Sequence, residues 1–287
     1  MSHATEVAPL LPLLYEDVVR RALLEDLGRA GDVTTDAIVP ADATACVALV
    51  ARSPGRLAGL DAALHAFRIL DHSCRFELHL ADGADTTRGA RIALVEGPAR
   101  ALLAAERTAL NLLGHLSGIA TATREAVSCL DGLATRVVCT RKTTPGLRVL
   151  EKHAVRVGGG GNHRFGLDDA VLVKDNHVAL AGGITEAVQR VRRTVGHLVK
   201  IEVEVDTLEQ LDEALELGVD AVLFDNMELP TLREAVRRAR GRALTEASGG
   251  IRPETVRAVA ETGVDLVSLG WLTHSAPSLD VALDVEV

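Results

Sequence analysis

The sequence predicts an α/β protein with two parts, a small N-terminal α+β domain and a parallel α/β barrel that is incomplete. Up to about residue 115, strand-like and helix-like segments are mixed without regular order. Beyond that point, short β-branched strands alternate with helices at a spacing of about 20–30 residues, which is typical of parallel βα units. Six such units are visible, fewer than the eight of a complete TIM barrel, so we expect an open barrel.

The bulk composition limits the classes of function. Hydrophobic residues make up 47% of the 287 residues but aromatic residues only 2%, so the core is aliphatic. A net charge of −9 argues against a partner that is a nucleic acid or a membrane surface. No apolar run approaches the roughly 18 residues that span a bilayer, and the first 21 residues do not resemble a signal peptide. The four cysteines are widely spaced, which favours reduced thiols in a cytoplasmic protein.

The N-terminal domain is expected to cover residues 1–116, with the tail 276–287 returning to it. Residues 31–40 (GDVTTDAIVP) are rich in turn formers and predict a loop. A break at Ser117-Gly118 divides a long helical pattern in two. The predicted strands are 43–50, 75–80 and 91–96, and the predicted helices are 13–27, 61–70, 98–116 and 119–130.

The barrel is expected to cover residues 117–275. Its predicted strands are 136–140, 170–174, 200–205, 221–224, 243–247 and 266–269. Its predicted helices are 185–194, 208–216, 229–240 and 254–261. In a parallel barrel, functional side chains gather where the strands end. The residues at these ends are Thr140, Arg141, Lys142, Lys174, Glu204, Asp225, Ser248, Gly249, Gly250 and Gly270.

A cationic stretch from Cys139 to His177 marks the first two barrel units. It holds seven basic and four acidic residues, a net +3, so the rest of the −9 chain carries −12. It also holds three of the only four lysines in the chain, although arginine is the usual cation here. This concentration predicts a site for a small anion.

Four cations in this stretch are placed to bracket a ligand with several negative charges: Arg141, Lys142, Arg164 and Lys174. The alternative is that some of them pair with neighbouring aspartates. Three further cations, Arg148, Lys152 and Arg156, are expected on the surface of a helix. His163 is assigned to the site, the alternative being a solvated loop histidine, and His153 and His177 are left open.

Glycines and acids complete the candidate site. The run Gly158–Gly161 is neither a GxGxxG motif nor a P-loop, so by itself it is weak evidence. Ser248-Gly249-Gly250 and Gly270 follow the last two strands, where barrels often bind phosphate, although they could form simple turns.

The acids at the strand ends, Glu204 and Asp225, could hold ribose hydroxyls, ligate Mg²⁺ or stabilise a developing positive charge. A salt bridge to Lys174 or Lys200 is the structural alternative. Glu202 lies on the same face of its strand as Glu204, so spacing alone does not choose between these two glutamates.

Several motifs together resemble the quinolinate phosphoribosyltransferase family. They extend from Glu25 almost to the C-terminus, and the central block is highly specific. Small departures are a fourth glycine, Gly161, and the bulky Trp271 after Gly270. The motifs are EDLG, GDVTT, ERTALN, LSGIA, TRKTTPGLRVLEKHAVRVGGGGNHRFGLDDAVLVKDNH, EVEVDTLEQ, LFDN, ASGGI and LGWLTHS.

The resemblance implies a fold and a reaction. The fold would be an N-terminal α/β sandwich domain plus an open α/β barrel. The reaction would convert quinolinate and phosphoribosyl pyrophosphate, with Mg²⁺, into nicotinate mononucleotide, pyrophosphate and CO₂ for NAD synthesis. The alternatives are a related phosphoribosyltransferase of the molybdenum-transport-associated type, which acts on another aromatic acid, and a non-catalytic phosphosugar-binding barrel.

The resemblance also implies partners and residue roles. The enzyme would be a homodimer or a hexamer, with Arg107 reaching the quinolinate site of the neighbouring subunit. Arg141, His163, Arg164 and Lys174 would hold the two quinolinate carboxylates. Lys142 and Lys174 would face pyrophosphate, and Glu204 and Asp225 would face the ribose, making Lys142, Glu204 and Asp225 the candidate catalytic residues. Thr140, Ser248, Gly249, Gly250 and Gly270 would complete the substrate site.

Overall fold

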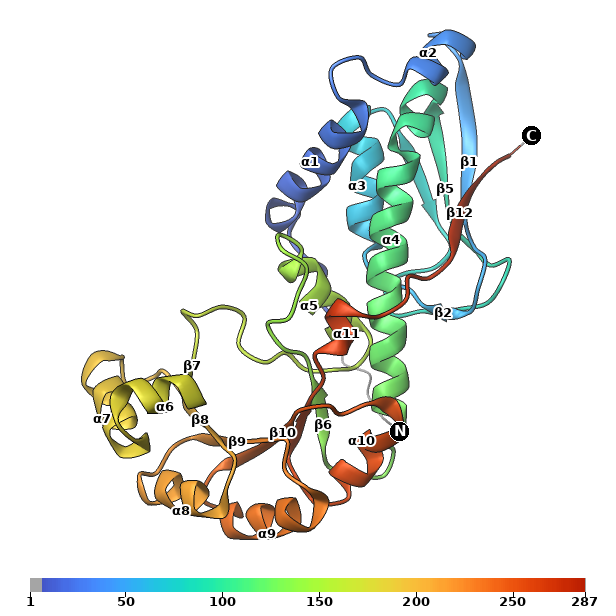
Figure 1. Cartoon of the computed structure of the whole chain (residues 1–287). Helices are drawn as coiled ribbons and strands as arrows, with labels where there is room; N and C mark the ends of the chain where they lie inside the picture. Colours follow the sequence, from blue (N-terminus) through green and yellow to red (C-terminus); the bar gives the residue numbers. More distant parts are fainter. Residues whose placement is uncertain (1–6, 287) are drawn as a thin grey trace. The chain divides into compact units, whose positions relative to one another are not determined.

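The computed structural model describes residues 7–286, and its chain forms two compact units (Figure 1). Residues 1–6 and Val287, at the ends of the predicted N-terminal domain and tail, lie outside this range. The first unit contains Met1–Arg124, Thr143–Gly159 and Leu272–Val287; the second contains Glu125–Lys142 and Gly160–Trp271. Each unit is therefore built from separate stretches of chain. The sequence analysis expected one domain of residues 1–116 with the tail 276–287, and a second of residues 117–275.

The first unit is built on a four-stranded antiparallel sheet with the order β12-β1-β5-β3. These strands are β1 (Thr44–Ala51), β3 (Arg75–Leu78), β5 (Arg91–Pro98) and β12 (Val281–Val285). A short pair, β2 (Gly55–Arg56) and β4 (Asp85–Thr86), lies beside it. The last part of the chain thus returns to pair with β1, from Val47 opposite Val285 to Ala51 opposite Val281.

Helices complete this unit: η1 (Pro12–Leu14), α1 (Glu16–Leu27), α2 (Val33–Ile38), α3 (Leu60–Leu70), α4 (Ala99–Ser128) and α5 (Arg148–Val157). The prediction of a loop at 31–40 is wrong, because α2 lies within it. Asp32 begins this helix by accepting hydrogen bonds from the backbone N–H groups of Thr34 and Thr35. The sequence VTTDAI has little helical pattern of its own, and the N-cap stabilises the helix.

Helix α4 runs without interruption through Ser117 and Gly118, so the predicted break there is wrong. Two of its glycines permit close contact with the segment before β12. A Cβ atom on Gly114 would lie 2.8 Å from the carbonyl oxygen of Leu279, and one on Gly118 would lie 2.1 Å from that of Pro277. These glycines therefore serve close packing within the helix rather than ending it.

Helix α5 is more deeply buried than its charged sequence suggested. Lys152 is only 1% exposed, so its assignment to the helix surface is wrong, whereas Arg156 is exposed as expected. The neighbouring Glu151 is fully buried, and its carboxylate accepts from the backbone N–H of Thr144 at 3.1 Å and lies 2.8 Å from His115 Nε2. A buried carboxylate needs such partners because desolvation without them is costly.

The second unit is an open parallel α/β barrel, which confirms the predicted fold class. Its six strands have the order β6-β11-β10-β9-β8-β7, and among the described strands β6 and β7 do not pair with each other. The strands are β6 (Arg136–Val138), β7 (Val171–Val173), β8 (Ile201–Val205), β9 (Ala221–Asp225), β10 (Leu244–Ser248) and β11 (Leu266–Ser268). Every predicted barrel strand is present within two residues of its expected ends.

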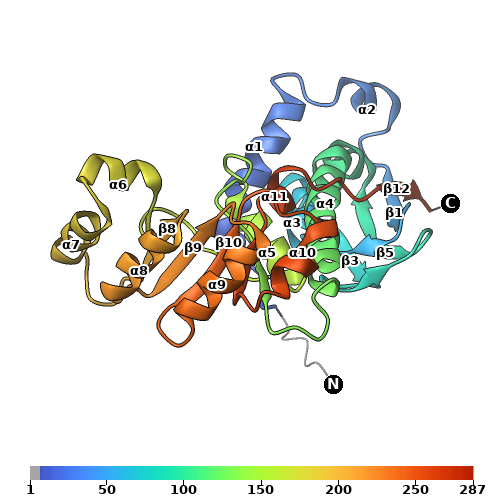
Figure 2. The ribbon, with the colours of Figure 1, turned by 60° about the horizontal axis from the view of Figure 1, so that its bottom comes forward.

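Helices cover the outer face of this sheet (Figures 1 and 2). They are α6 (Asp175–Ala181), α7 (Ile184–Thr194), α8 (Leu208–Glu216), α9 (Leu229–Ala239) and α10 (Pro253–Ala260). The short α11 (Trp271–His274) follows β11, and all of it after Trp271 belongs to the first unit. The sequence did not predict α6 or α11. Val203, Val222 and Phe224 are almost completely buried, and their neighbours along the strands face the opposite side. Among the helices within residues 7–286, none has the length and apolar character needed to cross a membrane.

Candidate active site

The face of the barrel sheet opposite the helices carries the acids. Strand register places Glu204, Leu223 and Glu246 level with one another on β8, β9 and β10, and Asp225 level with Ser248. Glu202 and Glu204 share this face because side chains alternate along a strand. Both glutamates that the sequence left as alternatives therefore face the same side, at different depths.

The segment after β6 brings Thr140, Arg141 and Lys142 to the carboxyl-terminal edge of the sheet. The Thr140 hydroxyl oxygen accepts a hydrogen bond from the backbone N–H of Lys142 at 3.0 Å, which fixes a tight turn. Gly161 lies beside this strand, donating to Val137 O and accepting from Cys139 N–H. The fourth glycine of the run thus extends the backbone pairing along β6.

Lys174 and Glu204 form an ion pair at the same edge. The Lys174 Nζ atom lies 2.5 Å from Glu204 Oε2, and the lysine side chain is 47% exposed. His177 fixes the backbone here, because its Nδ1 accepts from the N–H of Lys174 at 2.9 Å at the start of α6. Of the structural alternatives for the acids, the pair with Lys174 is present, whereas Lys200 pairs with Asp220.

Asp225 is held by its neighbour Asn226. The Asn226 side-chain amide donates to Asp225 Oδ2 at 2.7 Å, and Asn226 has a left-handed backbone with φ 51°. Gly249, with φ +96°, packs directly against it, since a Cβ there would lie 2.1 Å from Asn226 Oδ1. Glycine is required at this position both by conformation and by space.

The glycine segment after β10 is tied to the start of α11. The indole Nε1–H of Trp271 donates to the carbonyl oxygen of Ile251 at 3.1 Å. Gly250 has φ +57°, and Gly270 lies next to Trp271 at the end of β11. Trp271 thus supports the glycine segment from the neighbouring loop.

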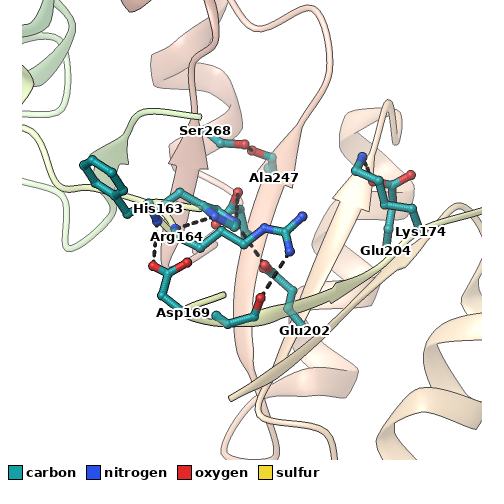
Figure 3. Close-up of polar contacts among 11 residues, drawn as sticks. His163, Arg164, Asp169, Lys174, Glu202, Glu204, Ala247 and Ser268 are labelled. Carbon is teal, nitrogen blue, oxygen red and sulfur yellow. Dashed lines mark hydrogen bonds and ion pairs between the residues drawn. The ribbon is translucent and has the colours of Figure 1, made fainter. Parts of the chain in front are cut away.

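A largely buried group of side chains, which we call the His163 cluster (His163, Glu202 and Glu246), lies deeper on the same face. His163 Nε2 is 2.9 Å from Glu202 Oε2 and 3.7 Å from Glu246 Oε1 (Figure 3). Its Nδ1 accepts from the backbone N–H of Arg164 at 2.7 Å. Glu246 is 1% exposed, and burial, followed by the negative charge of Glu202, raises the pKa of Glu246 to about 7.

Arg164 extends beside this cluster. Its Nη1 donates to the carbonyl oxygen of Ala170 at 3.1 Å, and the loop that follows is closed by Asp169, which accepts from the N–H groups of Phe165 and Gly166. Burial and the positive charge of Arg141 lower the pKa of Arg164, and the charges of Glu202 and Asp169 oppose that effect. The two guanidinium groups are therefore close enough for their charges to interact, and such a pair suits a ligand with negative charge.

The second unit contains every predicted site residue except Arg107. Arg107 lies in the first unit on α4, with its side chain 65% exposed and 3.9 Å from Glu106. His153 also lies in the first unit, buried and 3.5 Å from Asp82. Two residues of the site escaped sequence analysis: Glu246, a single acid inside the strand LTEAS, and Asn226, whose left-handed backbone no pattern indicated.

Two family models together match the chain from residue 32 to residue 284, apart from residue 118. Residues 32–117 match the model "Quinolinate phosphoribosyl transferase, N-terminal domain", and residues 119–284 match "Quinolinate phosphoribosyl transferase, C-terminal domain". A probable nicotinate-nucleotide pyrophosphorylase (carboxylating) of Bacillus subtilis is 48% identical over 274 residues, covering 95% of this chain and 94% of that protein. The corresponding Mycobacterium leprae enzyme is 46% identical, covering 94% and 96%.

Solved structures give the same result. The NadC structure from Streptococcus pyogenes superposes with a TM-score of 0.93 at 40% identity, covering 98% of this chain and 100% of that one. The nicotinate-nucleotide pyrophosphorylase from Francisella tularensis has a TM-score of 0.93 at 36% identity, covering 98% and 99%. The chain therefore belongs to the quinolinate phosphoribosyl transferase family.

Proposed function

We propose that this chain transfers the phosphoribosyl group of phosphoribosyl pyrophosphate to quinolinate, with loss of CO₂, to form nicotinate mononucleotide for NAD synthesis. The observation that carries the proposal is the close grouping of cations and acids in the second unit. Arg141, Lys142, Arg164 and Lys174 follow the first two strands, while Glu204 and Asp225 stand on the next two. An anion-binding site alone would gain nothing from these carboxylates.

The guanidinium groups suit the two carboxylates of quinolinate. Arginine gives paired hydrogen bonds to a carboxylate, and the mutual repulsion of Arg141 and Arg164 is relieved when a dianion binds. Lys174 is already bound to a carboxylate, that of Glu204, and can exchange this partner for a substrate oxygen. Holding quinolinate in a fixed orientation places its ring nitrogen against C1 of the ribose, which supplies much of the rate enhancement.

In the transfer step, negative charge develops on the leaving pyrophosphate and positive charge on the ribose, and the site provides groups of opposite charge for each. The bond between ribose C1 and the pyrophosphate oxygen breaks, and its electron pair leaves with pyrophosphate, which Lys142 stabilises. Positive charge develops on the ribose, where Glu204 and Asp225 stabilise it electrostatically. The quinolinate nitrogen then bonds to C1. The ring, now positively charged, accepts the electrons released as CO₂ departs, and the ring carbon takes a proton from solvent.

We further propose that Mg²⁺ accompanies phosphoribosyl pyrophosphate. The carboxylates of Glu204 and Asp225, on adjacent strands, are oxygen donors of the type that Mg²⁺ prefers, so the residues present fit this ion. When bound, Mg²⁺ neutralises negative charge on the pyrophosphate leaving group. Asn226 orients one of these carboxylates through its amide, and Lys174 balances the charge of the other.

A homodimer that shares its active sites is the assembly we propose, with a hexamer of such dimers as the alternative. Arg107 projects from α4 with a largely exposed side chain and would reach the quinolinate site of the neighbouring subunit. Several large apolar side chains of the first unit are exposed as well, which is typical of a surface covered by another subunit. They are Leu11, Leu13, Leu14, Leu24, Val33 and Ile38.

A cytoplasmic location completes the proposal. The described cysteines, Cys46, Cys74, Cys129 and Cys139, carry thiols that are not joined in disulfides. Free thiols are typical of proteins in a reducing compartment.

An assay with purified protein, quinolinate, phosphoribosyl pyrophosphate and Mg²⁺ tests the reaction. We expect nicotinate mononucleotide and CO₂ in equal amounts. Nicotinate is the matched control substrate, because it lacks one carboxylate, and its kcat/KM should be lower by about 10- to 100-fold, the value of one charged hydrogen-bonded contact. Equal kcat/KM for the two acids would show that the arginine assignment is wrong.

Mixed dimers test the shared site. Arg107→Ala should raise the KM for quinolinate, and mixing it with a Lys142→Ala protein should restore part of the activity, because one of the two sites would then be intact. Absence of any rescue, with dimer formation checked by sedimentation, would contradict a shared site.

A further inference from the structure

Two carboxylates near the proposed quinolinate site, one buried and one largely buried, have no part in the steps above. Glu202 and Glu246 stand on β8 and β10 and converge on the ring of His163. Glu246 is almost completely buried, and its Oε1 atom has no hydrogen-bond partner. An acid kept in such a place, at a cost in desolvation, calls for a physical explanation.

Hydrogen bonding fixes the tautomer of His163. Its Nδ1 accepts the backbone N–H of Arg164 at 2.7 Å, so Nδ1 presents a lone pair and carries no hydrogen. The ring hydrogen is then on Nε2, which donates it to Glu202 Oε2 at 2.9 Å. Both ring nitrogens are engaged within the protein, so in this arrangement His163 acts on the substrate through Arg164.

The charges around the cluster are unequal. Glu202 is paired with His163 and also offsets the charge of Arg164, whose own neighbour is Arg141. Across the sheet, Glu246 faces Glu202 and His163, with the hydroxyl of Ser268 from β11 and the apolar Leu223 level with it on β9. A second full negative charge at Glu246 would repel Glu202 and compete with an incoming dianion for the arginines.

We propose that Glu202 and Glu246 are positioning residues that, together with His163, form a largely buried cluster that carries one negative charge and retains a proton on Glu246. Glu202 holds the His163 ring, and the ring holds the main chain of Arg164. The proton on Glu246 keeps the cluster from repelling quinolinate. This inference rests on the proposed function, because it assigns a role in binding the same substrate.

A metal ion is the competing explanation for a histidine and two acids whose ligand atoms lie within 4.8 Å of one another. The tautomer disfavours it. With Nδ1 bonded to the Arg164 N–H and Nε2 carrying the hydrogen, the ring offers no lone pair to an ion. The nearby guanidinium groups of Arg164 and Arg141 add repulsion.

Proton uptake on substrate binding is the measurement that tests the cluster. Titrating the full-length protein calorimetrically with quinolinate at pH 7, in two buffers of different ionisation enthalpy, gives the number of protons taken up. With the pKa of Glu246 near 7, a bound dianion should draw in roughly half a proton per site. The quinolinate Kd should rise about threefold to tenfold from pH 6 to pH 8.5.

Glu246→Gln mimics the protonated acid and should abolish both effects, leaving an uptake near zero and a flat Kd. Glu202→Gln removes the charge but keeps an oxygen for the His163 N–H, so it should weaken quinolinate binding at every pH. Asp212→Asn, which removes one carboxylate paired with Arg238 on the outer helices of the same unit, is the matched control and should keep the pH dependence. If Glu246→Gln fails to fold, Glu246→Leu, which has a similar volume and no group that titrates, should lose the uptake instead.

Three outcomes would overturn the inference. One is a pH dependence of Kd that is unchanged in Glu246→Gln and in Glu246→Leu. A second is wild-type binding without proton uptake. A third is stoichiometric Zn²⁺ or Mn²⁺ binding that disappears in each of the cluster variants. If wild-type protein neither binds quinolinate nor forms product, the proposed function itself has failed, which separates the two cases.

Discussion

Two glutamates on one strand, Glu202 and Glu204, face the same side of the barrel sheet two residues apart and serve different purposes. Glu204 is paired with Lys174, whose long side chain is about half exposed and can move. Glu202 is paired with His163, whose side chain is only 14% exposed and is fixed at both nitrogens. The difference lies in the partner. A carboxylate whose partner can move is available to the substrate. A carboxylate whose partner is fixed instead holds the neighbouring residues of the site in place.

The largest effect on kcat is expected for Lys142, at the carboxyl-terminal edge of the barrel sheet. Lys142→Ala should lower kcat by at least about 100-fold, because the lysine stabilises the departing pyrophosphate. Lys142 is exposed, so the free energy of unfolding should change by less than about 1 kcal/mol. Steady-state kinetics and urea unfolding measure the two quantities. A kcat near that of wild type would contradict the assignment of Lys142 to the departing pyrophosphate.

Paired substitutions separate the two glutamates directly. Glu204→Ala should lower kcat by about 100-fold while leaving stability within about 1 kcal/mol, because its partner Lys174 regains water. Glu202→Ala should instead destabilise the protein by about 2–4 kcal/mol, because it leaves the buried His163 without its acceptor. Equal losses in the free energy of unfolding in the two variants would show that Glu204 and Glu202 do not have these different roles.

Gly249 lies at the carboxyl-terminal edge of the barrel sheet, but its substitution should reduce stability, as that of Glu202 does. Gly249→Ala requires a left-handed backbone and places a Cβ against Asn226, so we expect a loss of about 1–3 kcal/mol in the free energy of unfolding. The KM for phosphoribosyl pyrophosphate should rise as well, because Asn226 orients Asp225. Gly241→Ala, which shares a positive φ of 72° but has nothing within 4 Å, controls for backbone strain alone.

A change in stability of similar size, but dependent on pH, is expected in the His163 cluster. The pKa of Glu246 is raised in the folded state, so the native protein keeps a proton that the unfolded chain loses. Stability from this group is therefore present below pH 4.5 and is lost as pH rises through about 7. Relative to wild type, Glu246→Gln should gain about 1–3 kcal/mol between pH 5 and pH 8, measured by urea unfolding at each pH.

Much of the barrel was predictable because its strands and helices repeat a simple pattern. Apolar β-branched runs marked all six strands, and the end of each strand then located the edge with Lys174, Glu204 and Asp225. The roles of these residues remain predictions. The helix α2 was missed because a single N-cap, Asp32, stabilises it rather than a periodic apolar face.

Burial and long-range pairing were harder to read. Lys152 looked like a surface residue because charged side chains on a helix are usually solvated, yet packing of α5 encloses it. The choice between Glu202 and Glu204 depended on their partners, and His163 lies 39 residues from Glu202 in sequence. Glu246 had no neighbouring pattern at all, because its environment is created by strands that are distant along the chain.

Trp271 gives this protein an optical probe of its own. It is the single tryptophan of the chain, and its indole N–H is bonded to the backbone at Ile251, two residues beyond Gly249. Indole emission responds to hydrogen bonding and to nearby charge. Ligands that reach the glycine segment should therefore change the fluorescence of the unmodified protein, so that phosphate occupancy can be followed in real time without a label.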